Sequence, residues 1–461
     1  MNILTRLSTI SVLILVIGFL NIGCKKFLDE KSNKKLAIPQ TLEDLQALLD
    51  NTGGINEAGP SEGEISADDY YLTDADWGGL TYETDKNVYN WGNGIIFSDK
   101  VSSGWSLGYK TIYYCNTALE GLKKLGPDIQ QGQQFKETKG QAHFFRANAF
   151  LDMAIIWCKA YDEKSSSTDL GLPLHLVTDF NAKLTRANLQ QTYQQTINDL
   201  KTAINLLPNH PISKWRGSKA ASYGLLARTY LSMRDYQNAY LNADSCLQHC
   251  NDLIDYNTLD NASNTPIPLN NPEVIFNRSI QTTEAISTAT AKISDDLYKS
   301  YADNDLRKVV FYRLRPDGTL RFKGNYRQGS SLFSGISTNE IYLIRAECLA
   351  RNGDIEEAMT DLNHLLVNRW KKQNGRTTFI DLKANSKAEA LSSILEHRRK
   401  ELIMRGLRWM DIKRLNKEGV NISLKRIING QTYELPANDH RFALPLPENV
   451  IRLSGMQQNP R

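Results

Sequence analysis

Two segments of the chain carry small residues at matching positions, and this repeat strongly limits what the chain can fold into. Ala227 is followed by Ala239, and Ala346 by Ala358, twelve positions later in each case and with a polar turn in between. Two antiparallel helices approach closely only where small side chains cross, so each segment predicts a tight helical hairpin. The two units begin 119 positions apart and do not form a continuous array in the sequence.

Helical periodicity recurs through most of the chain beyond Trp105. In residues 193–207, apolar side chains step by four, three, four and three positions, and Pro208 then ends the helix. Residues 139–157 predict another helix, which can pair with residues 189–207 as a further unit with an inserted loop. We therefore predict a mainly α protein with hairpins of the tetratricopeptide type.

Strand signals are few and lie in the C-terminal half. Residues 309–313 and 319–322 flank a Pro-Asp-Gly turn, and residues 424–428 and 431–435 flank Asn-Gly, which favours a tight hairpin. The Asn- and Pro-rich residues 251–272 indicate a connecting loop.

The first residues resemble an export signal. Met1 to Arg6 carries one positive charge, and the apolar run from Leu7 to Leu20 is shorter than the ~20 residues that span a bilayer. Gly23 precedes Cys24, as in bacterial lipoprotein signals, so we expect cleavage before Cys24 and lipid attachment to it. A plain signal peptide with an incidental cysteine is the alternative.

The expected organisation divides the chain into four parts. A signal peptide occupies residues 1–23, and a lipidated polar tether occupies residues 24–40. Residues 41–250 form an N-terminal region with aromatic-rich loops and helical hairpins, and residues 251–461 form a C-terminal region. No later segment is apolar for long enough to cross a membrane.

Composition excludes some classes of function. The 55 basic and 51 acidic residues are well mixed and give a net charge of +4, which provides no electrostatic case for binding nucleic acid. The five cysteines beyond Cys24 are scattered and do not form a disulfide framework. Cys246, His249 and Cys250 share a helical face, and buried thiols are favoured there over a metal site.

The chain contains no familiar catalytic or cofactor motif. It has no P-loop, dinucleotide glycine pattern, His-Glu-x-x-His or Gly-x-Ser-x-Gly element, so we predict no catalytic residues, no cofactor and no metal. A pair of carboxylates for glycoside hydrolysis stays open, because their separation in space decides it. The dense charges between residues 396 and 414 favour structural ion pairs over anion binding.

Aromatic residues gather in residues 51–104, which are rich in Gly, Asp and Asn and predict long surface loops. Sugars bind with their apolar faces on aromatic rings while carboxylates and amides take the hydroxyl groups, and peptides exploit the same mixture. The chosen ligand-binding candidates are Trp77, Tyr71, Asp74 and Tyr82, with Tyr298, Tyr301 and Tyr326 as weaker ones. For Trp105 and Tyr109, which lead into a helix, a core position is expected.

Four stretches together resemble the SusD/RagB family of outer-membrane nutrient-binding lipoproteins. They are Cys24-Lys25-Lys26-Phe27-Leu28-Asp29; residues 141–147 with 171–174, 192–193 and 206–208; residues 216–221; and residues 398–402 with 406–414, 445–447 and 458–460. They occur in the family's order and cover the mature chain from end to end.

The resemblance implies a single, mainly α body with four tetratricopeptide-like hairpins and a more irregular ligand-binding face. It also implies a lipid-anchored position on the outer membrane, facing the exterior, and a SusC-like TonB-dependent transporter as partner. The ligand would be an oligosaccharide or a peptide, with no catalysis. The alternatives are a scaffold lipoprotein for envelope assembly without a small ligand, and a glycan-cleaving enzyme.

Overall fold

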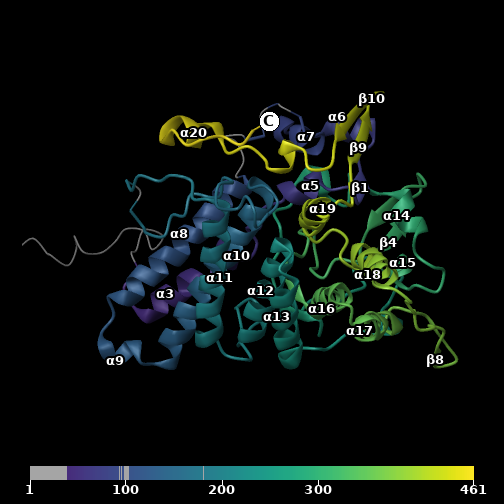
Figure 1. The fold of residues 1–461 in the computed structure, drawn as a ribbon, viewed down its shortest axis with the longest axis horizontal. Coiled ribbons are helices and arrows are strands. Elements are labelled where there is room, and N and C mark those ends of the chain that lie inside the picture. The colour runs from purple at the N-terminus through teal and green to yellow at the C-terminus, as the bar shows by residue number, and fades with distance from the viewer. Residues whose placement is uncertain (1–38, 93, 95, 98–102, 180, 461) are drawn as a thin grey trace, which may run out of the picture. The chain divides into compact units, whose positions relative to one another are not determined.

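Seven helices form a series in which each packs against the next one along the chain. They are α8 (Gly104–Lys123), α10 (Gln133–Trp157), α11 (Leu189–Leu206), α12 (Lys219–Met233), α13 (Tyr236–His249), α16 (Thr338–Asn352) and α17 (Ile355–Val367). The computed structural model describes residues 39–92, 94, 96–97, 103–179 and 181–460, and Thr41–Arg461 form one compact unit. The contacts run from α8 to α10 and α11, then through α12, α13 and α16 to α17 (Figure 1).

The mainly α prediction is confirmed, and so are the two hairpins α12–α13 and α16–α17. Their small residues Ala227, Ala239, Ala346 and Ala358 are fully buried, as close helix crossings require. The pairing of α10 with α11 across an inserted loop is also confirmed. The two units lie far apart in the sequence and do not form a continuous array there. In space the array is continuous, because α13 packs directly on α16.

Shorter helices and small ribbons complete the unit. The other α-helices are α3 (Leu42–Leu49), α4 (Thr52–Ile55), α5 (Glu62–Ser66), α6 (Asp74–Gly79), α7 (Glu83–Tyr89), α9 (Pro127–Gln130), α14 (Asp295–Lys299), α15 (Arg307–Val310), α18 (Lys387–Glu401), α19 (Arg408–Asn416) and α20 (Glu448–Ser454). The 3₁₀ turns are η2 (Tyr256–Thr258), η3 (Glu284–Ile286) and η4 (His440–Phe442). Strands pair as β1 (Tyr70–Tyr71) with β3 (Lys292–Ile293), β2 (Val274–Phe276) with β6 (Ile336–Ser337), β4 (Tyr312–Leu314) with β5 (Leu320–Phe322), β7 (Lys372–Gln373) with β8 (Arg376–Thr377), and β9 (Leu424–Ile428) with β10 (Gln431–Leu435).

Both predicted hairpins are present. β9 and β10 have the predicted bounds, and Asn429 and Gly430 both adopt positive φ, which matches the right-handed twist of the strands. β4 begins later than predicted, because residues 307–310 form α15. Figure 1 shows β9, β10, β1, α6 and α7 gathered on one side of the helical array.

Residues 51–104 differ from the prediction of long surface loops. Where described, they fold into α4, α5, α6, α7 and β1, and the stretch from Ala58 to Ala67 is buried. Helices of four to seven residues are too short to show an apolar stripe in the sequence, so periodicity did not reveal them.

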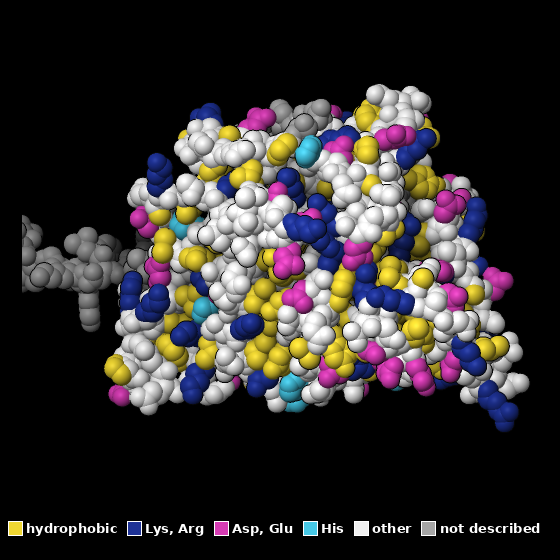
Figure 2. Space-filling view, viewed as in Figure 1, with side chains coloured by type: hydrophobic (Ala, Val, Ile, Leu, Met, Phe, Trp, Pro, Cys, Tyr) yellow, Lys and Arg dark blue, Asp and Glu magenta, His cyan; other side chains and the backbone are white. Residues whose placement is uncertain are grey.

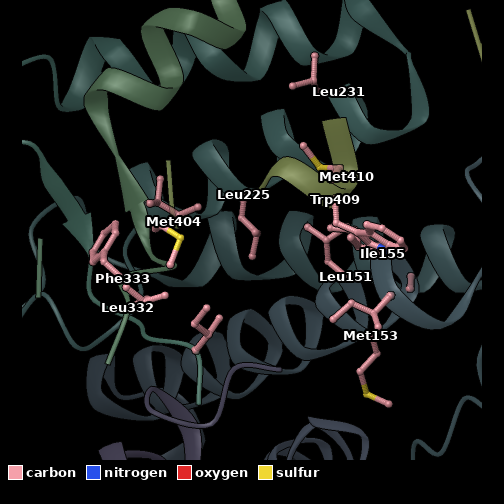
Figure 3. Close-up of a cluster of buried hydrophobic side chains, with 14 of the residues drawn as sticks. Leu151, Met153, Ile155, Leu225, Leu231, Leu332, Phe333, Met404, Trp409 and Met410 are labelled. Atoms are coloured by element: carbon pink, nitrogen blue, oxygen red, sulfur yellow. The ribbon is translucent and has the colours of Figure 1, made fainter. Parts of the chain in front are cut away.

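The hydrophobic core lies between the array and the small ribbons. Figure 3 shows Leu151, Met153 and Ile155 of α10 near Trp409 and Met410 of α19. Trp105 is buried as predicted and meets Trp157 edge to face, with ring centroids 5.4 Å apart, and Tyr109 is half-buried. Cys115, Cys158, Cys246 and Cys348 are buried free thiols, and Cys250 is half-buried.

Charged side chains between residues 396 and 414 make structural ion pairs, as predicted. Arg398 donates to Asp411 at 2.9 Å, and Arg414 donates to Glu347 of α16 at 2.6 and 2.8 Å. These groups are buried, so the pairs join α18 and α19 to the array rather than run along one exposed helix. On the face seen in Figure 2, basic and acidic side chains are interspersed.

Glu401 lies at the centre of a second buried ion network. It accepts hydrogen bonds from Arg369 at 2.8 and 2.9 Å, from Arg307 at 3.0 Å and from Asn339 at 2.8 Å. Arg369 also donates to Glu273 at 2.6 Å, and Arg307 donates to Asp305 at 2.7 Å. Burial alone would raise the pKa of Glu401, but the adjacent guanidinium groups of Arg369 and Arg307 outweigh it and hold that pKa at about 2.

We predict that Glu401→Gln lowers the free energy of unfolding by about 3 kcal/mol at pH 7, because it leaves buried cations incompletely compensated. The contribution of Glu401 is present above its unfolded pKa of 4.5 and is lost as pH falls toward 2. The difference between parent and variant should therefore shrink over that interval. Chemical denaturation at several pH values measures both effects.

Glu396→Gln is the matched control. Glu396 lies on the same helix, is exposed and pairs with Lys400. Its substitution should change the free energy of unfolding by less than about 1 kcal/mol. Equal effects of the two substitutions would contradict a special role for the buried network.

Candidate functional site

The short strand β1 and the helix α6 that follows it carry three of the predicted ligand-binding residues. β1 pairs antiparallel with β3, and Tyr71 lies opposite Lys292. Strand alternation buries Tyr70 and leaves Tyr71 38% exposed. The Lys292 ammonium pairs with the carboxylate of Asp76 in α6, so the ribbon holds the helix in place.

α6 begins at a capping box. The Thr73 hydroxyl accepts from the Asp76 N–H at 3.2 Å, and the Asp76 carboxylate accepts from the Thr73 N–H at 3.1 Å. Trp77 on this helix is half-buried, and Lys86 Nζ of α7 lies 5.5 Å from its ring centroid. Asp74 is exposed, but its Oδ1 accepts from the N–H of Asn429 at 2.7 Å and so positions the β9–β10 turn.

A pocket of about 170 Å³ lies beside α7. Its walls come from α5, from the start of α7 and from the residues around η3, and they include Tyr82, Glu62, Asp85, Thr283 and Glu284. The volume is below the roughly 300–1,000 Å³ of a site that encloses a whole small ligand. The pocket is therefore too small to enclose a whole ligand of that size.

Two buried polar atoms of residues in the pocket walls have no hydrogen-bond partner among the described residues. They are Glu62 Oε2 and Thr283 Oγ1. The other oxygen of Glu62 accepts from the N–H of Gly104 at 2.8 Å, at the first residue of α8. Because a buried polar atom without a partner is costly, these two atoms are a local cost of the fold at the pocket wall.

Three carboxylates share this pocket. Glu284 accepts from the Thr81 N–H at 2.7 Å and from the Thr81 hydroxyl at 2.8 Å, which joins η3 to the start of α7. Burial raises the pKa of Asp85 to about 6, with further contributions from the neighbouring Glu62 and Glu284 carboxylates. Burial likewise raises the pKa of Glu62.

The structure separates the seven candidate aromatic and acidic residues into two groups. Tyr71, Asp74, Trp77, Tyr82 and Tyr298 are at least partly exposed; the first four lie on β1, α6 and the start of α7. Tyr298 is on α14, just after β3, and its ring meets Tyr312 edge to face at 5.5 Å.

Tyr301 and Tyr326 are buried, each only 2% exposed. The Tyr301 hydroxyl donates to the carbonyl of Lys400 at 2.7 Å, and the Tyr326 hydroxyl accepts from Asn339 at 3.0 Å and bonds to Glu273. Both rings and both hydroxyls are used inside the core, so we no longer propose a ligand contact for either residue.

Sequence reasoning missed the pocket carboxylates Glu62, Asp85 and Glu284 and the pocket residue Thr283. The pocket brings Glu62 and Glu284 together from distant parts of the chain, and no local pattern signals that contact.

Within the described ranges, no group of His, Cys, Asp and Glu side chains is arranged to hold a metal ion. None of the helices in that part of the chain combines the length and the apolar character that crossing a bilayer requires. Cys24, the predicted lipid-attachment residue, lies outside the described residues.

Two protein-family models match the chain. A family model described as "Starch-binding associating with outer membrane" matches residues 26–231, and the model of the SusD family matches residues 333–461. The fold and these matches define an outer-membrane-associated class of α-helical proteins. The chain belongs to the SusD/RagB family. No curated protein matches it.

Solved structures share the fold across nearly the whole chain. A Bacteroides vulgatus protein named for sugar binding is 22% identical, with 92% of this chain and 99% of that chain covered and a TM-score of 0.73. A SusD superfamily protein from Bacteroides thetaiotaomicron is 21% identical, with coverage of 91% and 100% and a TM-score of 0.72. A SusD-like carbohydrate-binding protein from Bacteroides vulgatus is 22% identical, with coverage of 86% and 89% and a TM-score of 0.63.

We predict that Asp85→Asn stabilises the protein at pH 8 by about 1 kcal/mol, an estimate reduced for the partial exposure of the side chain. The raised pKa means that protonated Asp85 favours the fold at low pH, and that this contribution is lost as pH rises through about 6. Thermal melting should show a higher melting temperature for the variant at pH 8 and no gain at pH 3.5.

Glu83→Gln, an exposed position on the same helix, provides the control and should show no such difference between the two pH values. An Asp85→Asn variant that melts below the parent at pH 8 would contradict the view that three carboxylates repel one another in this pocket.

Proposed function

We propose that this protein binds nutrient glycans at the cell surface and delivers them, without catalysis, to a SusC-like TonB-dependent transporter. The observation that carries the binding proposal is the pocket beside α7, whose described walls combine the Tyr82 ring with the side chains of Glu62, Asp85, Glu284 and Thr283. Carboxylates and hydroxyl groups suit the hydroxyl groups of a sugar unit, and the Tyr82 ring provides an aromatic wall.

The aromatic residues next to the pocket support an oligomeric ligand. Trp77 packs beside Lys86 of α7, the helix whose first turn lines the pocket, and Tyr71 lies on the ribbon that anchors α6. We propose that Trp77, Tyr71 and Tyr82 contact successive units, with Tyr298 at the margin and with the free oxygen of Asp74 as an acceptor.

The names of similar proteins favour a glycan over a peptide as the ligand. Two of the similar solved structures carry names that refer to sugar or carbohydrate binding, and one matching family model is described as starch-binding. Delivery to a transporter follows from the family resemblance, and the continuous helical array offers an extended surface for such a partner.

We predict that Trp77→Ala weakens glycan binding by about tenfold or more, because a buried aromatic contact is worth at least about 1.4 kcal/mol. Affinity electrophoresis through gels that contain soluble starch, xylan or partly deacetylated chitin measures this. The parent protein should be retarded in at least one gel.

Trp370→Ala is the control for that experiment. Trp370 is also half-buried, but it packs on Phe379 just beyond α17 and does not line the pocket. Retardation should be unchanged in this variant. Equal retardation of the parent and of Trp77→Ala would show that Trp77 is not part of the site. No retardation of the parent in any gel would contradict glycan binding.

We further propose that Cys24 carries the lipid that anchors the protein to the outer membrane. Replacing Cys24 by Ser removes the thiol that accepts the lipid. The variant should leave the membrane fraction, because it lacks the acyl chains that hold the protein in the bilayer. Cell fractionation with immunoblotting measures the distribution, and Cys158→Ser is the control. A Cys24→Ser protein that stays in the membrane fraction would contradict lipid anchoring.

A further inference from the structure

The outer face of the β4–β5 hairpin carries four cationic side chains. Arg313 lies directly opposite Arg321 on the paired strand. The backbone hydrogen bonds of Arg315 and Lys323 continue the ladder at its two ends, so strand alternation places their side chains on the same face. Like charges directly opposite each other on paired strands are destabilising, and a sequence that breaks such a local rule often does so at a functional surface.

The fold gives these cations only uncharged partners. Arg313 and Arg321 both donate to Oδ1 of Asn264, Arg321 at 3.4 Å. Arg315 donates to the backbone carbonyls of residues 288 and 289, and Lys323 donates to those of residues 261 and 263. Every hydrogen bond that the four side chains make to described residues therefore ends on a neutral oxygen.

Two acidic side chains lie close to this face but bond to their own loops. Asp260 accepts from a backbone N–H of its loop at 3.0 Å, and Asp317 accepts from the N–H and the hydroxyl of Thr319 at 2.9 and 2.7 Å. Burial lowers the pKa of Lys323, and the adjacent Arg313 lowers it further, against the opposite effect of Asp260. The positive charge of the face is therefore not neutralised from within the fold.

Several N–H groups on this face are free to bind a ligand from solvent. The Nε and Nη1 atoms of Arg315 and of Arg321 donate to no described residue, and none of these atoms is buried. The guanidinium group presents its N–H groups in a planar fork that matches the oxygens of a carboxylate or a phosphate, and a sulfate ester presents similar oxygens. The free donors therefore suit an oxyanion.

The hairpin lies on the side of the protein that bears the candidate aromatic residues. β5 packs beside β3, which pairs with the strand of Tyr71, and the ring of Tyr298 meets Tyr312 of β4 edge to face. Burial raises the pKa of the Tyr71 hydroxyl, and the carboxylates of Asp295 and of Asp317 in the hairpin turn raise it further. Figure 1 shows β1, α14 and β4 on one side of the array. A glycan that lies over Tyr71 and Tyr298 can therefore extend onto the hairpin.

We propose that the outer face of the β4–β5 hairpin binds the acidic groups of a glycan, that is, the carboxylates of uronic acid units or sulfate esters. The proposal rests on the glycan-binding function proposed above and specifies its substrate class. Nucleic acid fits less well, because the 55 basic and 51 acidic residues are mixed along the chain and the unpaired cations occupy one short hairpin.

The test compares acidic oligosaccharides with their own neutral forms. The probes are the tetramer of galacturonic acid with its methyl ester, and a sulfated carrageenan tetrasaccharide with its desulfated form. Isothermal titration calorimetry at pH 7 measures the affinities. We expect at least one acidic tetramer to bind at least about tenfold more tightly than its neutral form. The pair that shows the preference identifies the group as a carboxylate or a sulfate ester.

The double variant Arg315→Gln, Arg321→Gln removes two charges with free N–H groups. It should weaken binding of the acidic tetramer at least about tenfold and leave the affinity for the neutral form unchanged. Lys371→Gln combined with Arg376→Gln is the matched control, since it makes the same change of charge in exposed side chains at the β7–β8 hairpin, and it should retain the preference. Arg321→Gln alone supplies the result if the double variant does not fold.

The outcomes distinguish this inference from the function on which it rests. Neutral forms that bind as tightly as the acidic ones would overturn the charge preference and leave glycan binding intact. A preference that survives in the β4–β5 variant, or that is lost equally in the β7–β8 control, would overturn the assignment to this hairpin. A short DNA oligonucleotide that binds as tightly as the acidic tetramer, in dependence on the same arginines, would overturn the acidic glycan as its ligand.

Discussion

The buried charges around Glu401 are the constraint on which the rest of the fold depends. Glu401 is the last residue of α18. Its partners are Arg307 of α15, Asn339 of α16 and Arg369, which lies just beyond the end of α17. Each buried guanidinium needs its carboxylate, because a lone charge in the core is far more costly than a missing apolar contact. The network therefore accepts one arrangement of these helices and fixes the C-terminal part of the array.

Helices α18 and α19 also hold the segment that bears Tyr71. Arg399 of α18 donates to Asp69 at 2.9 Å, and Arg408 of α19 donates to Asp68 at 2.7 Å. Asp68 and Asp69 directly precede β1, which carries Tyr71 and leads to α6. Ion pairs thus connect α18 and α19 to the β1 ribbon, which leads to the short helices that bear the aromatic residues. The pocket beside α7 brings together carboxylates from α5, α7 and η3.

Sequence patterns predicted the helices and hairpins that apolar periodicity and turn residues determine. The small residues of α12–α13 and α16–α17 and the Asn429-Gly430 turn each carry a local physical requirement, and the structure meets it. The buried position of Tyr326 was not predictable, because its partner Glu273 comes from a distant segment. The pocket was missed for the same reason, since Glu62 and Asp85 meet Glu284 only in the folded chain. The composition of residues 51–104 led to the candidate residues in this segment, but no local pattern revealed its contacts with η3.

We propose that this protein is the binding partner of a transporter, and one measurement tests this most directly. The tagged full-length protein is purified from detergent-solubilised outer membranes, and its partners are identified by mass spectrometry. We predict a stoichiometric complex with a TonB-dependent barrel. Purification of the protein alone, or together with envelope-assembly factors, would contradict the uptake role and would favour a scaffold that uses the continuous helical array for assembly.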